Sequence, residues 1–157
     1  MKKVIFLGCF IIAFVSGFAQ NIKIVNDLYV DENEKAFNGE YTTFYESGNK
    51  KSTCTISNGK LSGPIVYFFE TGERLETGYF KNGLKDGEWV RYNLAGLKTS
   101  EGNYINGKKE GNWKVWDDKG TQRFEMYYSN NEKTGIWKEW DMSGVLVGEK
   151  SYLFTSR

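Results

Sequence analysis

Residues 80–92 read FKNGLKDGEWVRY, and close copies of this stretch recur along the chain at a fixed spacing. Its second glycine, Gly87, belongs to a column whose members are 24 residues apart, and another glycine follows each member by nine. A fixed period of this length is typical of repeat proteins, in which each unit buries its apolar face only against its neighbours. The two columns are Gly39, Gly63, Gly87, Gly111 and Gly135, and Gly48, Gly72, Gly96, Gly120 and Gly144.

The large rings keep the same period. Because aromatic side chains supply most of the burial in a thin fold, we interpret these columns as structural core, with a row of ligand-stacking rings as the alternative. They contain half of the chain's aromatic residues, including all five tryptophans. The three columns are Tyr41, Ile65, Trp89, Trp113 and Trp137; Phe44, Phe68, Tyr92, Trp116 and Trp140; and Ile56, Phe80, Tyr104, Tyr128 and Tyr152.

Two kinds of turn divide each unit. Asn-Gly pairs at 58–59, 82–83 and 106–107 predict type I′ hairpins, because both central residues of that turn need positive φ. Asn130-Asn131 is a weaker form of the same signal. The second glycine column predicts turns that end with a glycine in the left-handed region. Two turns per unit predict two strands per unit, and no helix is expected between residues 39 and 152.

The strand pattern makes three further predictions. Trp89 and Tyr92 are three apart, so a bulge or strong twist is needed to bring both rings to one side of the sheet. Gly78 and Gly102 are predicted to leave room for a tryptophan ring from the neighbouring strand. Residues 22–30 are expected to form an extra opening strand, and residues 145–154 a closing one.

Residues 1–19 have the pattern of a signal peptide. A short positive start, Met1-Lys2-Lys3, precedes an apolar stretch over residues 4–15 and small residues at Gly17 and Ala19. We predict cleavage after Ala19 and export to the periplasm or the medium. The alternative, an uncleaved membrane anchor, is disfavoured because the apolar run is shorter than the ~20 residues of a spanning helix.

Composition excludes several function classes. Removing Lys2 and Lys3 takes the net charge from +1 to −1, which argues against a nucleic-acid partner. The chain has no histidine, so the usual general base and zinc ligand are missing, and Cys54 is the only cysteine after the leader. We interpret the acidic column Glu101, Glu125 and Glu149 as solvated surface charge. The sequence therefore predicts a protein that is not an enzyme, with no catalytic, cofactor-binding or metal-binding residues, and it does not identify the binding residues.

These copies resemble the MORN repeat (membrane occupation and recognition nexus) in its bacterial variant form. The resemblance covers about residues 38–152 and rests on residues 80–92, 104–113 and 128–137, which carry the Asn-Gly and Gly-x-Trp elements or close forms of them. It implies an all-β fold, an elongated array of five 24-residue hairpin repeats in a curved antiparallel sheet. The expected organisation is a signal peptide at 1–19, an N-terminal capping strand at 20–38, and a repeat domain at 39–157 with units starting at 39, 63, 87, 111 and 135.

The resemblance implies less about function. MORN arrays are associated with membrane apposition, scaffolding and oligomerisation, and similar bacterial arrays are grouped with a YwqK-like antitoxin family. We expect an exported scaffold whose partner is another envelope or secreted protein, with self-association also open. The alternatives are a cell-wall glycan bound by the aromatic columns and anionic lipid bound by two basic rows. Those rows are Lys50, Arg74 and Lys98, and Lys85, Lys109 and Lys133.

Overall fold

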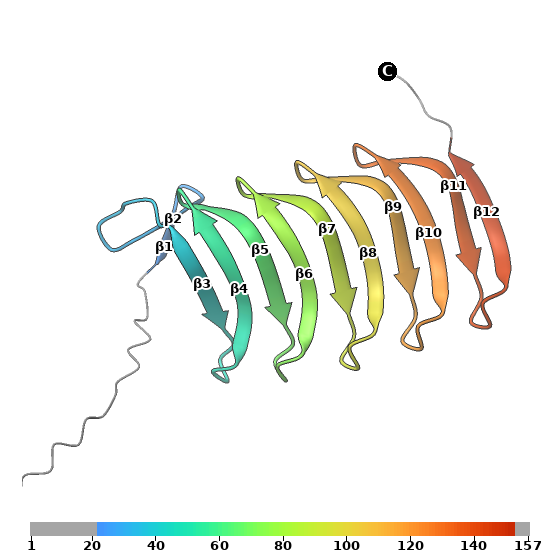
Figure 1. Ribbon diagram of the computed structural model, residues 1–157, viewed down its shortest axis with the longest axis horizontal. Coiled ribbons are helices and arrows are strands. Elements are labelled where there is room, and N and C mark those ends of the chain that lie inside the picture. Colours follow the sequence, from blue (N-terminus) through green and yellow to red (C-terminus); the bar gives the residue numbers. More distant parts are fainter. Residues whose placement is uncertain (1–21, 153–157) are drawn as a thin grey trace, which may run out of the picture.

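The computed structural model describes residues 22–152 and is all-β, with every strand antiparallel to its neighbours. Ten strands, β3 to β12, follow one another in sequence order across one long sheet (Figure 1), which confirms the predicted fold class. The predicted signal peptide, residues 20–21 and residues 153–157 lie outside the described residues. Nowhere in residues 22–152 is there a helix long and apolar enough to cross a membrane.

The twelve strands have these bounds: β1 Lys23–Val25, β2 Leu28–Val30, β3 Gly39–Phe44, β4 Lys50–Ser57, β5 Lys60–Phe68, β6 Arg74–Lys81, β7 Leu84–Tyr92, β8 Lys98–Ile105, β9 Lys108–Trp116, β10 Gln122–Ser129, β11 Glu132–Trp140 and β12 Leu146–Tyr152. The two-residue turns lie along one rim of the long sheet, and the longer turns lie along the other (Figure 1). The two-residue turns have positive φ at both central residues, for example 50° at Asn58 and 72° at Gly59, as type I′ geometry requires. The longer turns end at glycines with positive φ, such as 77° at Gly96. Both predicted turn types are therefore confirmed.

Hydrogen bonds between successive two-residue turns hold neighbouring hairpins together. The Gly83 N–H donates to the Leu61 carbonyl, and the Gly107 N–H to the Lys85 carbonyl, both at 2.7 Å. The N–H of the first central residue of such a turn donates to a side chain of the earlier hairpin. For example, the Asn130 N–H donates to a Glu110 carboxylate oxygen at 2.8 Å. These bonds join units that are distant in sequence without any disulfide.

Asn131 makes two hydrogen bonds to the earlier hairpin, although its turn has the weakest sequence signal. Its N–H donates to the Lys109 carbonyl at 3.0 Å, and its side-chain oxygen accepts from the Lys109 N–H at 2.6 Å. The residue has a φ of 74°, which glycine adopts more readily. The asparagine side chain therefore adds a second hydrogen bond to the one that a glycine amide would make.

Replacing Asn131 with alanine is expected to lower the free energy of unfolding by about 0.5–1.5 kcal/mol, because the Lys109 N–H loses its acceptor. Urea denaturation of the purified protein measures the change. Asn131→Gly is the matched control, because it loses the same hydrogen bond and relieves the positive φ. The alanine variant should be the less stable of the two, and an alanine variant as stable as the parent would refute the role of this bond.

The buried core lies in the N-terminal half of the sheet. We call the side that carries Trp89, Trp113 and Trp137 the aromatic face. A cluster of buried side chains gathers on it, and Ile56 is 1% exposed and Trp89 3% exposed. The remaining buried members of the cluster are Cys54, Ile65 and Phe80. Burial raises the pKa of the Cys54 thiol, which fits a structural role.

The N-terminal segment corrects one prediction. Residues 22–30 form a two-stranded hairpin, not one opening strand, because Asn26 and Asp27 both have positive φ, at 49° and 63°. The hairpin forms its own small sheet and does not extend the long one. It covers the first part of the aromatic face, where the Tyr29 ring lies 5.5 Å from the Tyr41 ring. The Tyr29 N–H also donates to the Gly59 carbonyl at 2.8 Å.

The second aromatic column was also expected on the wrong side. Trp89 pairs with Gly102 and Arg91 with Ser100 without a break, so β7 alternates regularly from Trp89 to Tyr92. The extra residue lies in the partner strand, between Ser100 and Lys98. A bulge in the partner does not change the alternation of β7, so Trp89 and Tyr92 point to opposite faces. The equivalent register shifts follow Thr43, Tyr67, Val115 and Glu139.

Candidate interaction surfaces

A continuous row of rings runs along the aromatic face. Successive centroids are 4.8 to 6.0 Å apart, and most pairs meet edge to face, an arrangement that aromatic rings favour. A Cβ atom at Gly78 or Gly102 would overlap the ring of Trp89 or Trp113, so the predicted glycine–tryptophan packing is confirmed. The row consists of Phe80, Trp89, Tyr104, Trp113, Tyr128, Trp137 and Tyr152.

A lysine covers each tryptophan of this row. The Nζ of Lys85 lies 3.5 Å from the nearest ring centroid of Trp89, and those of Lys109 and Lys133 lie 4.5 and 4.4 Å from their tryptophans. These are cation–π contacts, in which the aliphatic stem also packs on the ring. Burial lowers the pKa of the Lys85 amine. One of the two predicted basic rows is thus part of the aromatic surface.

The two halves of the aromatic face differ. The N-terminal half is covered by the β1–β2 hairpin and Phe37, whereas in residues 22–152 no second layer covers the half that runs from β8 to β12. Apart from Glu139, the charged side chains that the strand register places on this uncovered half are basic. By the strand register its basic side chains are Lys109, Lys133 and Lys150.

The opposite face carries a ladder of alternating charge. In five successive strands, β8 to β12, residues directly opposite one another are acidic and basic in turn. Lys114 Nζ lies 4.0 Å from a Glu101 carboxylate oxygen, and Lys138 Nζ lies 3.9 Å from Glu149. The glutamates, expected to be solvated surface charge, therefore lie opposite lysines, and Lys114 and Lys138 are also 24 residues apart. The charge ladder is Glu101, Lys114, Glu125, Lys138 and Glu149.

Reversing one charge inside the ladder should destabilise the sheet. Lys114→Glu places a third carboxylate directly between Glu101 and Glu125, and we expect about 1 kcal/mol of lost stability, because like charges opposite one another repel. Thermal unfolding at low and high salt measures the loss, which salt should reduce. Lys108→Glu, an exposed change outside the ladder in the same strand, is the control. Equal losses in the two variants would contradict the ladder.

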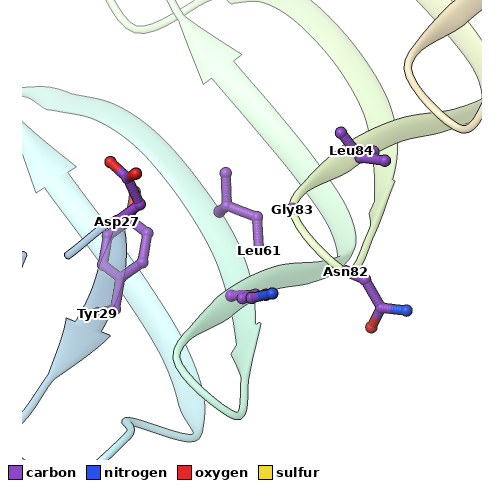
Figure 2. Close-up of a pocket in the computed structure, with 7 residues that line it drawn as sticks. Asp27, Tyr29, Leu61, Asn82, Gly83 and Leu84 are labelled. Carbon is purple, nitrogen blue, oxygen red and sulfur yellow. The ribbon is translucent and has the colours of Figure 1, made fainter.

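Two open hollows lie on the aromatic face. The first, of about 260 Å³, separates the β1–β2 turn from the turn between β6 and β7. Figure 2 shows Asp27 and Tyr29 on one side of it, Asn82 and Leu84 on the other, and Leu61 between them. Its volume lies below the range that is typical of small-molecule sites. Residues 22–152 contain no group of three acidic, cysteine or histidine side chains placed to hold a metal ion.

The second hollow, of about 250 Å³, lies beside the last strand. Gly148 leaves space there, since a Cβ atom at this position would make only ordinary contact, with Glu139. The hollow therefore joins the aromatic face to the edge of the sheet. Its lining residues on this face are Phe124, Trp137, Glu139, Gly148, Lys150 and Tyr152.

The outer edge of β12 is the other open feature of this end. β12 pairs with β11 on one side and with no strand of the described chain on the other. Three apolar residues at its start are exposed, namely Val145 at 58%, Leu146 at 45% and Val147 at 59%. An exposed edge with apolar side chains is a template for pairing with another strand.

Comparison with known proteins gives little further information. No family model matches the chain, and no curated protein matches it. Among solved structures, the chain resembles part of the glycosylation-associated protein (Gap123) complex from Streptococcus agalactiae, with 18% identity, a TM-score of 0.38, and coverage of 64% of this chain and 18% of the other. It also resembles part of the accessory secretory protein 1, 2 and 3 structure from Streptococcus pneumoniae, with 12% identity, a TM-score of 0.38, and coverage of 75% and 21%.

This chain therefore spans about a fifth of the length of either solved chain. Likeness at this level defines neither a family nor an activity. The MORN resemblance stays a prediction from the sequence.

Proposed function

We propose that the protein is an exported, non-enzymatic scaffold of the MORN type that binds another envelope or secreted protein. The observation that carries the proposal is the unequal cover of the aromatic face. The chain's own hairpin covers the N-terminal half, and the C-terminal half presents lysine-covered rings, a hollow and an unpaired edge. An uncovered apolar surface beside an open edge is typical of protein-binding sites. An antitoxin-like role is one form of this function, in which the partner is a toxin.

The alternatives have less support. A sugar stacks on a free ring face, and here a lysine ammonium lies over the ring of each row tryptophan. Anionic lipid would need one continuous basic patch, yet the two predicted rows are separated. Lys50, Arg74 and Lys98 lie at strand starts, and the Lys98 amine is paired with Glu101 at 2.9 Å. The other row lies across the tryptophans.

Photo-crosslinking in the native cell envelope tests the proposal. A photoreactive residue replaces Lys133 on the uncovered half of the aromatic face, and in a matched variant it replaces Lys51, an exposed lysine of β4. We expect a protein adduct of defined mass from the first position and none from the second. Equal labelling at both positions, or binding to anionic liposomes without any protein adduct, would refute the scaffold.

A further inference from the structure

Two regular rows of the sheet end together at β12. On one face the charge ladder ends with Glu149, whose inner neighbour is Lys138 and whose side chain is 50% exposed. The earlier acidic members of the ladder, Glu101 and Glu125, each have a paired strand on both sides. On its outer side Glu149 has no opposite residue among the described strands.

The row of rings ends in the same way on the aromatic face. Tyr104 and Tyr128 each lie between two tryptophans, with centroid distances of 5.1 to 6.0 Å. Within residues 22–152, Tyr152 has one such neighbour, Trp137 at 4.8 Å. The hollow beside Gly148 adjoins it.

The strands inside the array show what completes both rows. In β9 and β11 a tryptophan of the aromatic row is followed directly by a lysine of the charge ladder, as Trp113-Lys114 and Trp137-Lys138. Adjacent residues of a strand point to opposite faces, so one dipeptide serves both rows at once. A strand added outside β12 needs an aromatic residue followed by a basic one to extend both the row of rings and the charge ladder.

We infer that the outer edge of β12 binds an extended segment of the partner protein, which carries an aromatic residue followed by a basic one. The segment adds as an antiparallel strand, with its base opposite Glu149 and its ring against Tyr152. Main-chain hydrogen bonds along the edge provide affinity, and the two side chains provide specificity. This inference rests on the proposed function, because it names the surface and the chemistry of the partner.

A second copy of this chain fits the edge less well. The first strand of the sheet, β3, has Tyr41-Thr42 at the equivalent position. Thr42 carries no charge for Glu149, and Tyr41 already contacts the Tyr29 ring of its own hairpin. Head-to-tail addition would leave the charge ladder incomplete.

A synthetic peptide with the sequence of β11, EKTGIWKEW, is the probe, and fluorescence anisotropy measures its binding to the purified protein. We expect a dissociation constant below about 1 mM. Exchanging the lysine that follows the first tryptophan of the peptide for glutamate should weaken binding about fivefold, because it replaces an opposite-charge cross-strand pair with a like-charge pair. Glu149→Lys in the protein should reverse the preference, so that the glutamate peptide binds more tightly.

Glu40→Lys is the matched control, since it reverses a glutamate in the strand at the other end of the sheet and should leave the preference unchanged. No binding at about 1 mM peptide would overturn the inference. It would also fail if the peptide preference did not depend on residue 149, or if sedimentation showed dimers that Glu149→Lys dissociates. Adducts at Lys133 together with any of these results would leave the scaffold proposal standing, whereas the absence of adducts at every position would refute the scaffold itself.

Discussion

Replacing Trp89 with alanine is expected to lower the free energy of unfolding by about 3–5 kcal/mol. Trp89 is 3% exposed and contacts Phe80 and Tyr104 edge to face, and its Nε1 donates to the Tyr79 carbonyl at 3.2 Å. The truncation removes all of these contacts and leaves a space that the surrounding strands cannot fill. Urea denaturation monitored by circular dichroism measures the loss.

Trp137→Ala is the matched control. Like Trp89, Trp137 has a lysine above its ring, and its Nε1 donates to a backbone carbonyl, that of Tyr127, at 3.0 Å. Unlike Trp89, it is only half-buried. The loss should therefore be clearly smaller than for Trp89. Equal losses at both positions would contradict the account of a core confined to the N-terminal half.

Replacing Gly102 with alanine should cost about 1–3 kcal/mol, the range for an overpacked core, although it adds a single methyl group. The new Cβ would overlap the Trp113 ring, so the ring must leave its present position, 5.1 Å from the Tyr104 ring. The backbone at Gly102 does not have the positive φ that disfavours alanine, so the effect is steric alone. Thermal unfolding of the purified variant measures it.

Gly148 offers a close control for this substitution. Its backbone also lacks positive φ, and an added Cβ would lie 3.7 Å from the nearest atom, which is ordinary contact. Gly148→Ala should therefore be close to neutral. A Gly102 variant as stable as the Gly148 variant would mean that the tryptophan ring does not occupy the space above Gly102.

The local features of the fold could be predicted from the sequence because each depends on a few adjacent residues. The type I′ turns follow from Asn-Gly pairs, and the space above Gly78 follows from a missing side chain next to a ring column. Both repeat at a fixed period, so an error in one copy is corrected by the others. The all-β fold with its long antiparallel sheet follows from these turns.

The features that depend on pairing between strands were missed. The alternation of Glu101 and Lys114 appears only when β8 and β9 are placed in register, and the contact of Lys85 with Trp89 spans the irregular pairing of β7 with β6. The side on which the Tyr92 ring lies depends on which strand carries the bulge. The Asn26-Asp27 turn occurs once, outside the period, so no other copy supported it.

The sheet is open, with β3 and β12 at opposite ends of the strand order and the outer edge of β12 unpaired within the described residues. Spin labels at Thr42 in β3 and Glu149 in β12 test it most directly, because the two residues stand in one row across ten strands. Cys54 is buried, so introduced cysteines take the labels. With about 4.8 Å between strands, we expect double electron–electron resonance to give a label separation of about 40 Å. A separation below about 20 Å would mean that the strands close on themselves, and would contradict the open sheet.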